Sequence, residues 1–475
     1  MLFPTVTFAI FFLIVLPLSW ALMPHRRAWQ AWILLASYVF YAWWDWRFVL
    51  LLAASTVVNH VLAVAIYRTK PIRRRKALLA SAVAFDIGLL GYFKYAGFFV
   101  SSAENTLSSL GIADATWIVN VTLPVGISFY TFMAISYVID TYRAELVPAS
   151  FARFAVFQAF FPHLVAGPIV RASELLPQLE SPRDPRRVNS GRAFILILSG
   201  LFLKVVIANH LATAIVDDVF AAPRAHSSLE VLFGIYGYAV QIFADFCGYT
   251  NIAIGIALLL GFQFPQNFAS PYTAVSLQDF WRRWHMTLSR WLRDYLYIPL
   301  GGSRKGRLLT YRNLMITMLL GGLWHGAAWT FVIWGGIHGI GLACERFMRD
   351  RRAARGLPEP EDTARRRWVG RIVTFHVVCF AWIFFRANSF ERAGAVIEQL
   401  FTAWGRPSPL VTTSVVVAIL VGIGGQYVRQ TTLTKVMLGF QRLPAVAQAA
   451  SLAVGLMVID TLGPQGVAPF IYFRF

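Results

Sequence analysis

The most regular feature of the chain is a series of apolar runs of about 20 residues, which recur from one end to the other. A helix rises about 1.5 Å per residue and the hydrocarbon core of a bilayer is about 30 Å thick, so each run is long enough to cross it. The pattern predicts an all-α polytopic membrane protein, a single domain over 1–475, with about eleven spans near 5–23, 29–47, 48–67, 77–100, 117–140, 193–215, 229–260, 313–346, 371–387, 409–427 and 444–461.

Two of these runs are too long for one level span. Residues 229–260 are predicted to form a tilted helix, a broken helix or two shorter pieces. Residues 313–346 carry glycine pairs at 321–322 and 335–336, and the flanking charges require this run to enter and leave the membrane on one side. We therefore expect a bent hairpin or two short helices. Non-helical backbone at membrane depth is tolerated only inside protein or beside a cavity, so this segment is expected to avoid lipid.

Positive charge is concentrated between the apolar runs. The chain has 43 Lys and Arg against 23 Asp and Glu, a net charge of +20. Such a balance is typical either of nucleic-acid binding or of cytoplasmic loops in a membrane protein. The basic blocks 68–76, 349–356 and 364–371 are short and flank spans, whereas 101–116 and 216–220 carry acids and no base. This alternation favours cytoplasmic loops over nucleic-acid binding, with the N-terminus outside.

Composition supports the same class, since 57% of residues are hydrophobic and only 14% are charged. The cysteines, Cys247, Cys344 and Cys379, are isolated in the sequence, which argues against a disulfide framework and against a zinc or iron–sulfur site. We expect no metal and no bound cofactor. The apolar N-terminal run lacks a basic n-region, so it is interpreted as the first transmembrane helix and not as a signal peptide.

The most informative polar segment is 276–306. Ser276 and Asp279 form a variant of the capping box, and the large apolar residues that follow recur at steps of four and three. Arg282 and Arg283 lie on other faces of this pattern. It predicts one basic amphipathic helix at the membrane surface. His285 borders the apolar face, where a lipid-bound helix has no need of an imidazole.

A second histidine, His325, lies inside the apolar run GGLWHGAAWTFVIWGG at 321–336. Burying a polar group without a partner costs roughly 2–7 kcal/mol, so this imidazole needs an explanation. It is either a neutral ring bonded to a backbone carbonyl or a catalytic group that takes a proton from a hydroxyl. His338 fits the first alternative better. The spacing of 325 and 338 is not the i, i+4 spacing of a helical metal pair.

The segments DFWRRWHMTLSRWLRDYLYIPLGG at 279–302 and LLGGLWHGAAWTFVIWGGIHG at 319–339 resemble the membrane-bound O-acyltransferase family, in the branch of the membrane subunit of bacterial alginate O-acetylation. The stretches at 123–143, 160–171, 243–262 and 379–387 agree with it. This resemblance implies a funnel of helices around a tunnel, with His325 as the essential histidine and His285 as its polar partner. It also implies an acyl donor, expected to be acetyl-CoA, on the cytoplasmic side of a bacterial inner membrane.

The resemblance further implies an extracytoplasmic polysaccharide acceptor, such as alginate or a related exopolysaccharide, and a periplasmic acetyltransferase as partner. His285, Asn267 or the indole N–H of Trp324 are candidate donors to the developing oxyanion. A basic set is a candidate for attracting the phosphates of coenzyme A, although the positive-inside rule accounts for it equally well: Arg282, Arg283, Arg304, Lys305 and Arg307.

Two other classes of function remain open at the level of sequence. A polytopic chain with buried polar groups is also typical of a transporter or polysaccharide exporter. Against this, the sequence shows no internal repeat, and the few charges inside the predicted spans make no obvious relay: Asp86, Lys94, Lys204 and Asp245. The third class is a non-catalytic scaffold of an acetylation complex, which would turn over no thioester.

Overall fold

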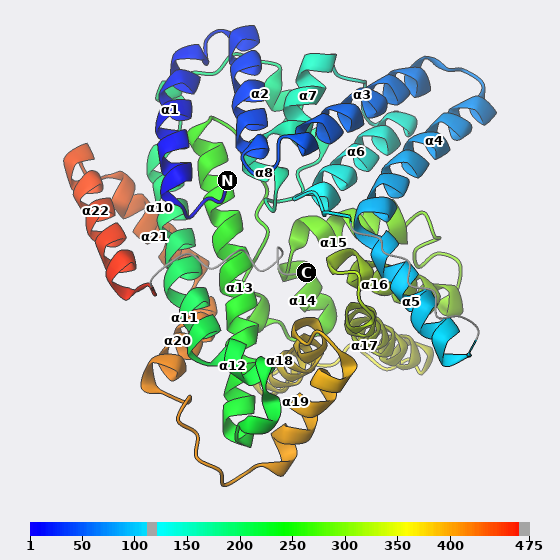
Figure 1. The fold of residues 1–475 in the computed structure, drawn as a ribbon, viewed down its shortest axis with the longest axis vertical. Helices are drawn as coiled ribbons and strands as arrows, with labels where there is room; N and C mark the ends of the chain where they lie inside the picture. Colours follow the sequence, from blue (N-terminus) through cyan, green and yellow to red (C-terminus); the bar gives the residue numbers. More distant parts are fainter. Residues whose placement is uncertain (112–120, 465–475) are drawn as a thin grey trace. The chain divides into compact units, whose positions relative to one another are not determined.

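A computed structural model describes residues 1–111 and 121–464 of the chain (Figure 1). Within these ranges the secondary structure is helical and no strand occurs, as the apolar runs predict. The chain divides into two compact units, which are described separately. Unit 1 comprises 1–190 and 256–265, and unit 2 comprises 191–255 and 266 onward. The single domain expected over 1–475 stays a prediction.

The α-helices of the first unit are listed in chain order: α1 (Val6–Leu22), α2 (Arg26–Ala42), α3 (Arg47–Arg68), α4 (Ile72–Leu90), α5 (Ala96–Ser109), α6 (Ile127–Tyr142), α7 (Phe151–Ala159), α8 (Phe161–Leu164) and α9 (Ala172–Leu175). A π-helix joins α4 to α5, and two short 3₁₀ turns follow α9: η1 (Gly91–Tyr95), η2 (Pro177–Leu179) and η3 (Pro185–Arg187).

The α-helices that follow are α10 (Ser190–Leu201), α11 (Asn209–Leu211), α12 (Asp217–Ala221), α13 (Ser228–Leu259), α14 (Leu277–Arg283), α15 (Met286–Leu292), α16 (Arg307–His325), α17 (Trp329–Ala354), α18 (Ala364–Arg386), α19 (Phe390–Thr402), α20 (Thr413–Gly424), α21 (Gln430–Gln441) and α22 (Ala445–Leu462). Between them lie π-helices η4 (Phe202–Ala208), η5 (Ala212–Val216) and η8 (Arg293–Tyr297), and 3₁₀ turns η6 (Pro223–Ala225), η7 (Pro271–Thr273) and η9 (Gly425–Tyr427).

Six helical segments of the described residues are long and apolar enough to cross a membrane: Arg47–Arg68, Ile72–Ser109, Ser190–Ala221, Ser228–Leu259, Ala364–Arg386 and Ala445–Leu462. Two shorter apolar helices, Val6–Leu22 and Thr413–Tyr427, coincide with further predicted runs. The predicted number of eleven spans stays a prediction. The region 313–346, predicted as one apolar run, is divided between two helices.

In unit 1, helix α6 packs against α3 and α4 and is buried along almost its whole length. The predicted start of this run, at residue 117, lies outside the described residues, and the helix itself begins only at Ile127. The preceding Gly126 has φ 78°, and a Cβ on it would lie 2.5 Å from the carbonyl oxygen of Leu164. Periodicity does not detect such a turn, which only glycine can form here.

In unit 2, α13 is one unbroken helix of 32 residues, so of the alternatives predicted for 229–260 the single helix is present, and neither a break nor two shorter pieces occurs. The segment from α10 to α12 runs beside it (Figure 1). The two approach closely at glycines, since a Cβ on Gly200 would lie 2.5 Å from the carbonyl oxygen of Gly248. Near this crossing, Lys204 Nζ lies 2.7 Å from Asp245 Oδ1, and both side chains are buried.

Helices α16 and α17 form the hairpin predicted for 313–346, although neither is short, with 19 and 26 residues. Helix α16 ends at His325, and the chain is extended at Gly326 before α17 begins at Trp329. The two helices lie antiparallel and in close contact, because Gly322 packs on the backbone of Phe331 and Gly335 on that of Met318. This turn places His325 at the end of a helix.

The segment 276–306 is not the single helix that its periodicity predicts. The cap is confirmed, since Ser276 Oγ accepts a hydrogen bond from the Asp279 N–H at 3.1 Å. The helix then stops at Trp284, and His285 adopts the left-handed conformation with φ 41° and ψ 54° before α15 begins. Most of the predicted apolar face is buried in protein, with Trp284 and Leu288 each 1% exposed. The left-handed residue His285 thus separates α14 from α15 and forms a buried corner between them, where the periodicity had predicted a continuous surface helix.

Candidate active site

His285 occupies this corner, fully buried between α14 and α15. Its Nδ1 lies 3.2 Å from Oδ1 of Asn267, a residue that is 1% exposed. The same Oδ1 accepts hydrogen bonds from the backbone N–H and the hydroxyl of Thr287, at 3.2 and 2.9 Å. The predicted candidates His285 and Asn267 are therefore in direct contact.

Aromatic rings enclose the rest of the His285 imidazole. Phe246 of α13 packs edge-on, with ring centroids 4.7 Å apart, and Trp324 of α16 lies at 6.0 Å. His285 lies outside the candidate membrane spans, and burial lowers the pKa of its imidazole to about 3. The ring is therefore neutral near pH 7.

His325 is the last residue of α16 and is 4% exposed. Three aromatic rings surround it, with centroid distances of 5.0 Å to Trp324, 5.1 Å to Trp334 and 5.2 Å to Phe385. Trp324 thus contacts both histidines. The structure brings together four of the residues singled out from the sequence, Asn267, His285, Trp324 and His325, and we call them the histidine cluster.

His338 is also fully buried, but its environment differs. The indole N–H of Trp281 donates to its Nδ1 at 3.3 Å, and its ring stacks on Phe280 with centroids 6.0 Å apart. The partner is an indole and not the backbone carbonyl expected for a structural histidine. The hydrogen bond nevertheless fits a ring that holds α14 against α17.

The basic candidates lie on exposed or paired positions. Arg282 is exposed, whereas Arg283 forms an ion pair with Asp279 at 2.8 Å. Arg304, Lys305 and Arg307 are exposed on the turn that leads into α16 and on its first residue. The structure does not place these five side chains in the histidine cluster.

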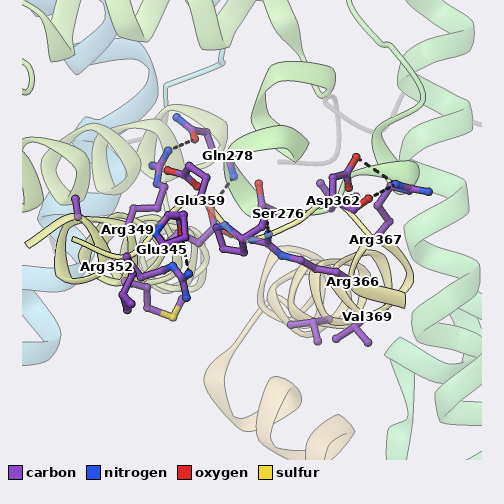
Figure 2. A pocket seen from close by; sticks show the side chains of 18 residues that line it. Ser276, Gln278, Glu345, Arg349, Arg352, Glu359, Asp362, Arg366, Arg367 and Val369 are labelled. Carbon is purple, nitrogen blue, oxygen red and sulfur yellow. Dashed lines mark hydrogen bonds and ion pairs between the residues drawn. The ribbon is translucent and has the colours of Figure 1, made fainter. Parts of the chain in front are cut away.

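A cavity of about 760 Å³ lies among the N-terminus of α14, the end of α17 and the start of α18 (Figure 2). Its charged lining is mixed: Arg349, Arg352, Arg366, Arg367, Glu345, Glu359 and Asp362. Several of these groups already have partners. Glu345 accepts from the N–H groups of Leu277 and Gln278, and Arg349 donates to the side chain of Gln278 at 2.9 Å. The hydrophobic periodicity does not predict this cavity, although the two basic blocks that line it, 349–356 and 364–371, stand out in the sequence.

Comparison with known proteins shows which family the chain resembles. Residues 86–390, which include both histidines, match the model of the membrane-bound O-acyltransferase family. The chain is 38% identical over 472 residues to a protein of Pseudomonas putida named "Probable alginate O-acetylase AlgI", covering 93% of this chain and 94% of that protein. It is 37% identical over 398 residues to the "Peptidoglycan O-acetyltransferase" of Helicobacter pylori, covering 78% and 73%.

The chain belongs to the membrane-bound O-acyltransferase family. It is therefore an O-acyltransferase and a multi-pass membrane protein, as the resemblance implied. A more distant relative, 29% identical over 286 residues, is the "Teichoic acid D-alanyltransferase" of Bacillus subtilis, covering 56% of this chain and 69% of that one.

In this O-acyltransferase, the sequence did not predict which phenylalanine rings surround the two histidines, nor the hydrogen bonds of Thr287 to Asn267, the residue that contacts His285. Phe246 and Phe385 lie in stretches that carry the family resemblance, but nothing in those stretches pairs them with a histidine. Thr287 lies two residues after His285, and its bonds to Asn267 depend on the turn at His285. The apolar spacing continues unbroken through His285, so periodicity offers no signal for this contact.

Proposed function

We propose that this O-acyltransferase takes an acetyl group from acetyl-CoA on the cytoplasmic side of a bacterial inner membrane and drives O-acetylation of an extracytoplasmic polysaccharide. Alginate or a related exopolysaccharide is the proposed acceptor, reached through a periplasmic acetyltransferase partner and a tunnel within a funnel of helices. Support for acetylation comes from relatives named alginate O-acetylase and peptidoglycan O-acetyltransferase.

One observation carries the proposal: two buried imidazoles, His285 and His325, contact the same indole, that of Trp324. Burying two imidazoles among aromatic rings costs free energy, so we expect these histidines to have a catalytic or structural role. Ionisable groups within membrane proteins are functional hypotheses by default. A neutral imidazole is the side chain best suited to take a proton near pH 7.

In the proposed reaction, an imidazole nitrogen of His325 takes the proton of the acceptor hydroxyl as its oxygen attacks the thioester carbonyl. A C–O bond forms and the carbonyl π pair moves onto oxygen. When that pair returns, the C–S bond breaks, and the imidazolium gives its proton to the departing thiolate of coenzyme A. Acetyl ester and free thiol are the products, and His325 is neutral again.

The position of His325 supports a transient positive charge on its ring. It is the last residue of the 19-residue helix α16, where the unsatisfied carbonyls carry the negative end of the helix dipole. A cation at this end is stabilised by about 0.3–1 kcal/mol at an exposed site and by up to about 2 kcal/mol when partly buried.

The direct test is acetyl transfer by His325→Ala, measured with labelled acetyl-CoA and purified protein. We expect a fall in kcat of about 10²–10⁴-fold, the usual contribution of a general base, with normal insertion and an unchanged elution volume. His338→Ala, which removes another buried histidine, is the control for structural loss. Wild-type turnover by His325→Ala would remove the proposal. A transporter or scaffold would leave the thioester intact even in the wild type.

The basic turn before α16 is proposed to attract the phosphates of the donor. Neutralising Arg304, Lys305 and Arg307 together to Gln should raise the KM for acetyl-CoA several-fold and leave kcat nearly unchanged, because binding that is equal in ground and transition states affects KM alone. The matched control is the pair Arg349→Gln and Arg352→Gln in the cavity of Figure 2. A rise in KM only in the cavity variants would assign the phosphates to the cavity.

A further inference from the structure

Asn267 binds three consecutive residues at the start of α15. Its backbone oxygen accepts from the Met286 N–H at 2.9 Å, and its side-chain oxygen contacts Thr287 and His285. His285 is the N-cap of α15 but makes no side-chain capping bond of its own. Asn267 therefore supplies, from 18 residues upstream, the acceptors that a capping side chain would offer.

These contacts determine which nitrogen of His285 carries hydrogen. The backbone N–H of Thr287 can only donate, so the Asn267 atom that faces it is the oxygen and not the amide nitrogen. The His285 nitrogen facing the same oxygen must then donate as well, which places the hydrogen on Nδ1. In a neutral imidazole with a hydrogen on Nδ1, Nε2 carries the lone pair.

Two polar atoms of this pair have no hydrogen-bond partner among the described residues. They are Nε2 of His285 and Nδ2 of Asn267, both on side chains that are at most 1% exposed. Buried polar groups are nearly always paired, so each unpaired one needs an explanation. Nε2 of His285 is an acceptor and Nδ2 of Asn267 is a donor, and a hydroxyl group can form a hydrogen bond with either kind of atom.

We infer that Asn267 is a positioning residue that holds His285 in the Nδ1–H form, so that Nε2 accepts a hydrogen bond from a hydroxyl of the acyl acceptor other than the one whose proton His325 takes. This inference rests on the proposed function for the identity of the substrate. It also removes His285 from the candidate donors to the oxyanion, because Nε2 in this form has no hydrogen to give. The amide N–H of Asn267 and the indole of Trp324 stay candidates for that role.

The electrostatic surroundings favour this arrangement. The groups that contact the ring include Phe246 of α13, Trp324 of α16 and Asn267, and none of these three side chains carries a charge. Within the histidine cluster, the other titratable group is His325, which contacts the same indole of Trp324. The imidazole is thus neutral, and its tautomer depends on one amide oxygen.

The first experiment needs no turnover. Protein labelled with ¹⁵N-histidine is studied by solid-state NMR in lipid, and His285→Asn identifies the His285 signals by difference. Asn tolerates the left-handed backbone and its amide can still donate to Asn267, so this variant suits the corner. We expect a protonated Nδ1 and an unprotonated Nε2 at pH 7.5. A hydrogen on Nε2, or on both nitrogens, would overturn the inference.

The second experiment changes Asn267 itself. Asn267→Leu keeps the volume but removes the acceptor, and kcat/KM for acetyl transfer should fall on the order of 10²-fold. Asn267→Asp keeps the acceptor, so it should restore most of this loss at high pH. Its carboxylate stabilises the imidazolium, and the acid limb of the pH profile should therefore move up by at least about one pH unit. A merely structural role would not produce this shift.

Thr287→Val is the matched control, because it removes one bond to the same oxygen and leaves the contact with His285. Its kcat/KM should stay within about threefold of wild type, with an unmoved pH profile. If His325→Ala is inactive while Asn267→Leu is fully active with an unmoved profile, the inference fails alone. If His325→Ala is active, the proposed function fails, and the NMR measurement still decides the tautomer.

Discussion

At the scale of single residues, the backbone of His285 is as unusual as its side chain. Few residue types other than glycine adopt a φ of 41°, although histidine, asparagine and aspartate do so more often than most. Strain of this kind costs about 1–3 kcal/mol and persists only where surrounding contacts hold it, often at functional sites. Here the contacts are the three hydrogen-bonded groups that converge on Asn267.

A pH dependence of stability follows from the burial of His285. Its pKa is about 3 in the folded chain and 6.5 in the absence of burial. Between these values the unfolded chain binds a proton at His285 that the folded chain does not. Above pH 6.5 this group therefore takes nothing from the free energy of unfolding, and below pH 6.5 that free energy falls as the pH decreases. The loss is at most about 1.4 kcal/mol per pH unit.

The measurement is the apparent Tm in detergent at pH 7.5 and pH 5.0. Wild-type protein should lose more stability on acidification than His285→Asn, which cannot bind the proton. Thr287→Val, which removes a bond to the same Asn267 oxygen, should behave like the wild type. An equal loss in all three proteins would mean that His285 does not contribute to the acid sensitivity.

Sequence alone singled out His285 and His325 as candidates because an imidazole in an apolar setting needs a partner, and this argument depends only on residue type; their proposed roles come from the family resemblance. It could not identify the contact of His285 with Asn267, since those residues are separated by 18 positions and meet only through the left-handed turn. Periodicity averages over several residues, so a single residue with positive φ is invisible to it.

At the scale of elements, the α16–α17 hairpin depends on which glycine of each pair faces the other helix. A Cβ on Gly335 would overlap the carbonyl of Met318, whereas the nearest atom to a Cβ on Gly336 is 3.7 Å away. Both glycines lie in the same helix and differ by one position. The glycine pairs did predict a bend in this region, but not which member makes the contact.

We expect Gly335→Ala to destabilise the protein by about 1–3 kcal/mol, because the helices must separate to admit the methyl group. Gly336→Ala should be neutral or slightly stabilising, since alanine favours helix by up to about 1 kcal/mol and has room here. The stability of each variant is measured by its apparent Tm and by the fraction of protein that elutes as a monodisperse species. Equal effects of the two variants would contradict the close approach.

The amphipathic segment 276–306 shows the limit of pattern at this scale. Its steps of four and three predicted one helix, and the apolar positions are indeed mostly buried. The protein instead uses α14, α15 and a π-helical turn, with their apolar sides against other helices. A membrane surface and a protein interior select the same residues, so hydrophobic spacing cannot separate them.

At the scale of the whole molecule, the distribution of charge predicts a direction for the chain in the membrane. The helical segment Ile72–Ser109 connects the basic block 68–76 with the acidic stretch 101–116, and its 38 residues exceed what one crossing requires. Cytoplasmic loops are enriched in Lys and Arg, so the end near residue 73 should face the cytosol.

Cysteine labelling of cells tests this topology in a Cys344→Ser background, because Cys344 is exposed and the other two cysteines are buried. Ser108→Cys should react with a membrane-impermeant maleimide added from outside the membrane that holds the protein. Arg73→Cys should react only after that membrane is opened. The reverse pattern would invert the orientation of this helix.

The π-helical turns within Ser190–Ala221 carry an implication for how related chains diverge. A π-turn holds one residue more than the α-turn it replaces, so Phe202–Ala208 and Ala212–Val216 each behave as an inserted residue that the helix has absorbed. Losing one residue at either place would restore an ordinary α-turn and leave the residues beyond it facing the same neighbours. Single-residue gaps in alignments of such chains are therefore to be sought here, inside a membrane-crossing helix, as well as in the loops.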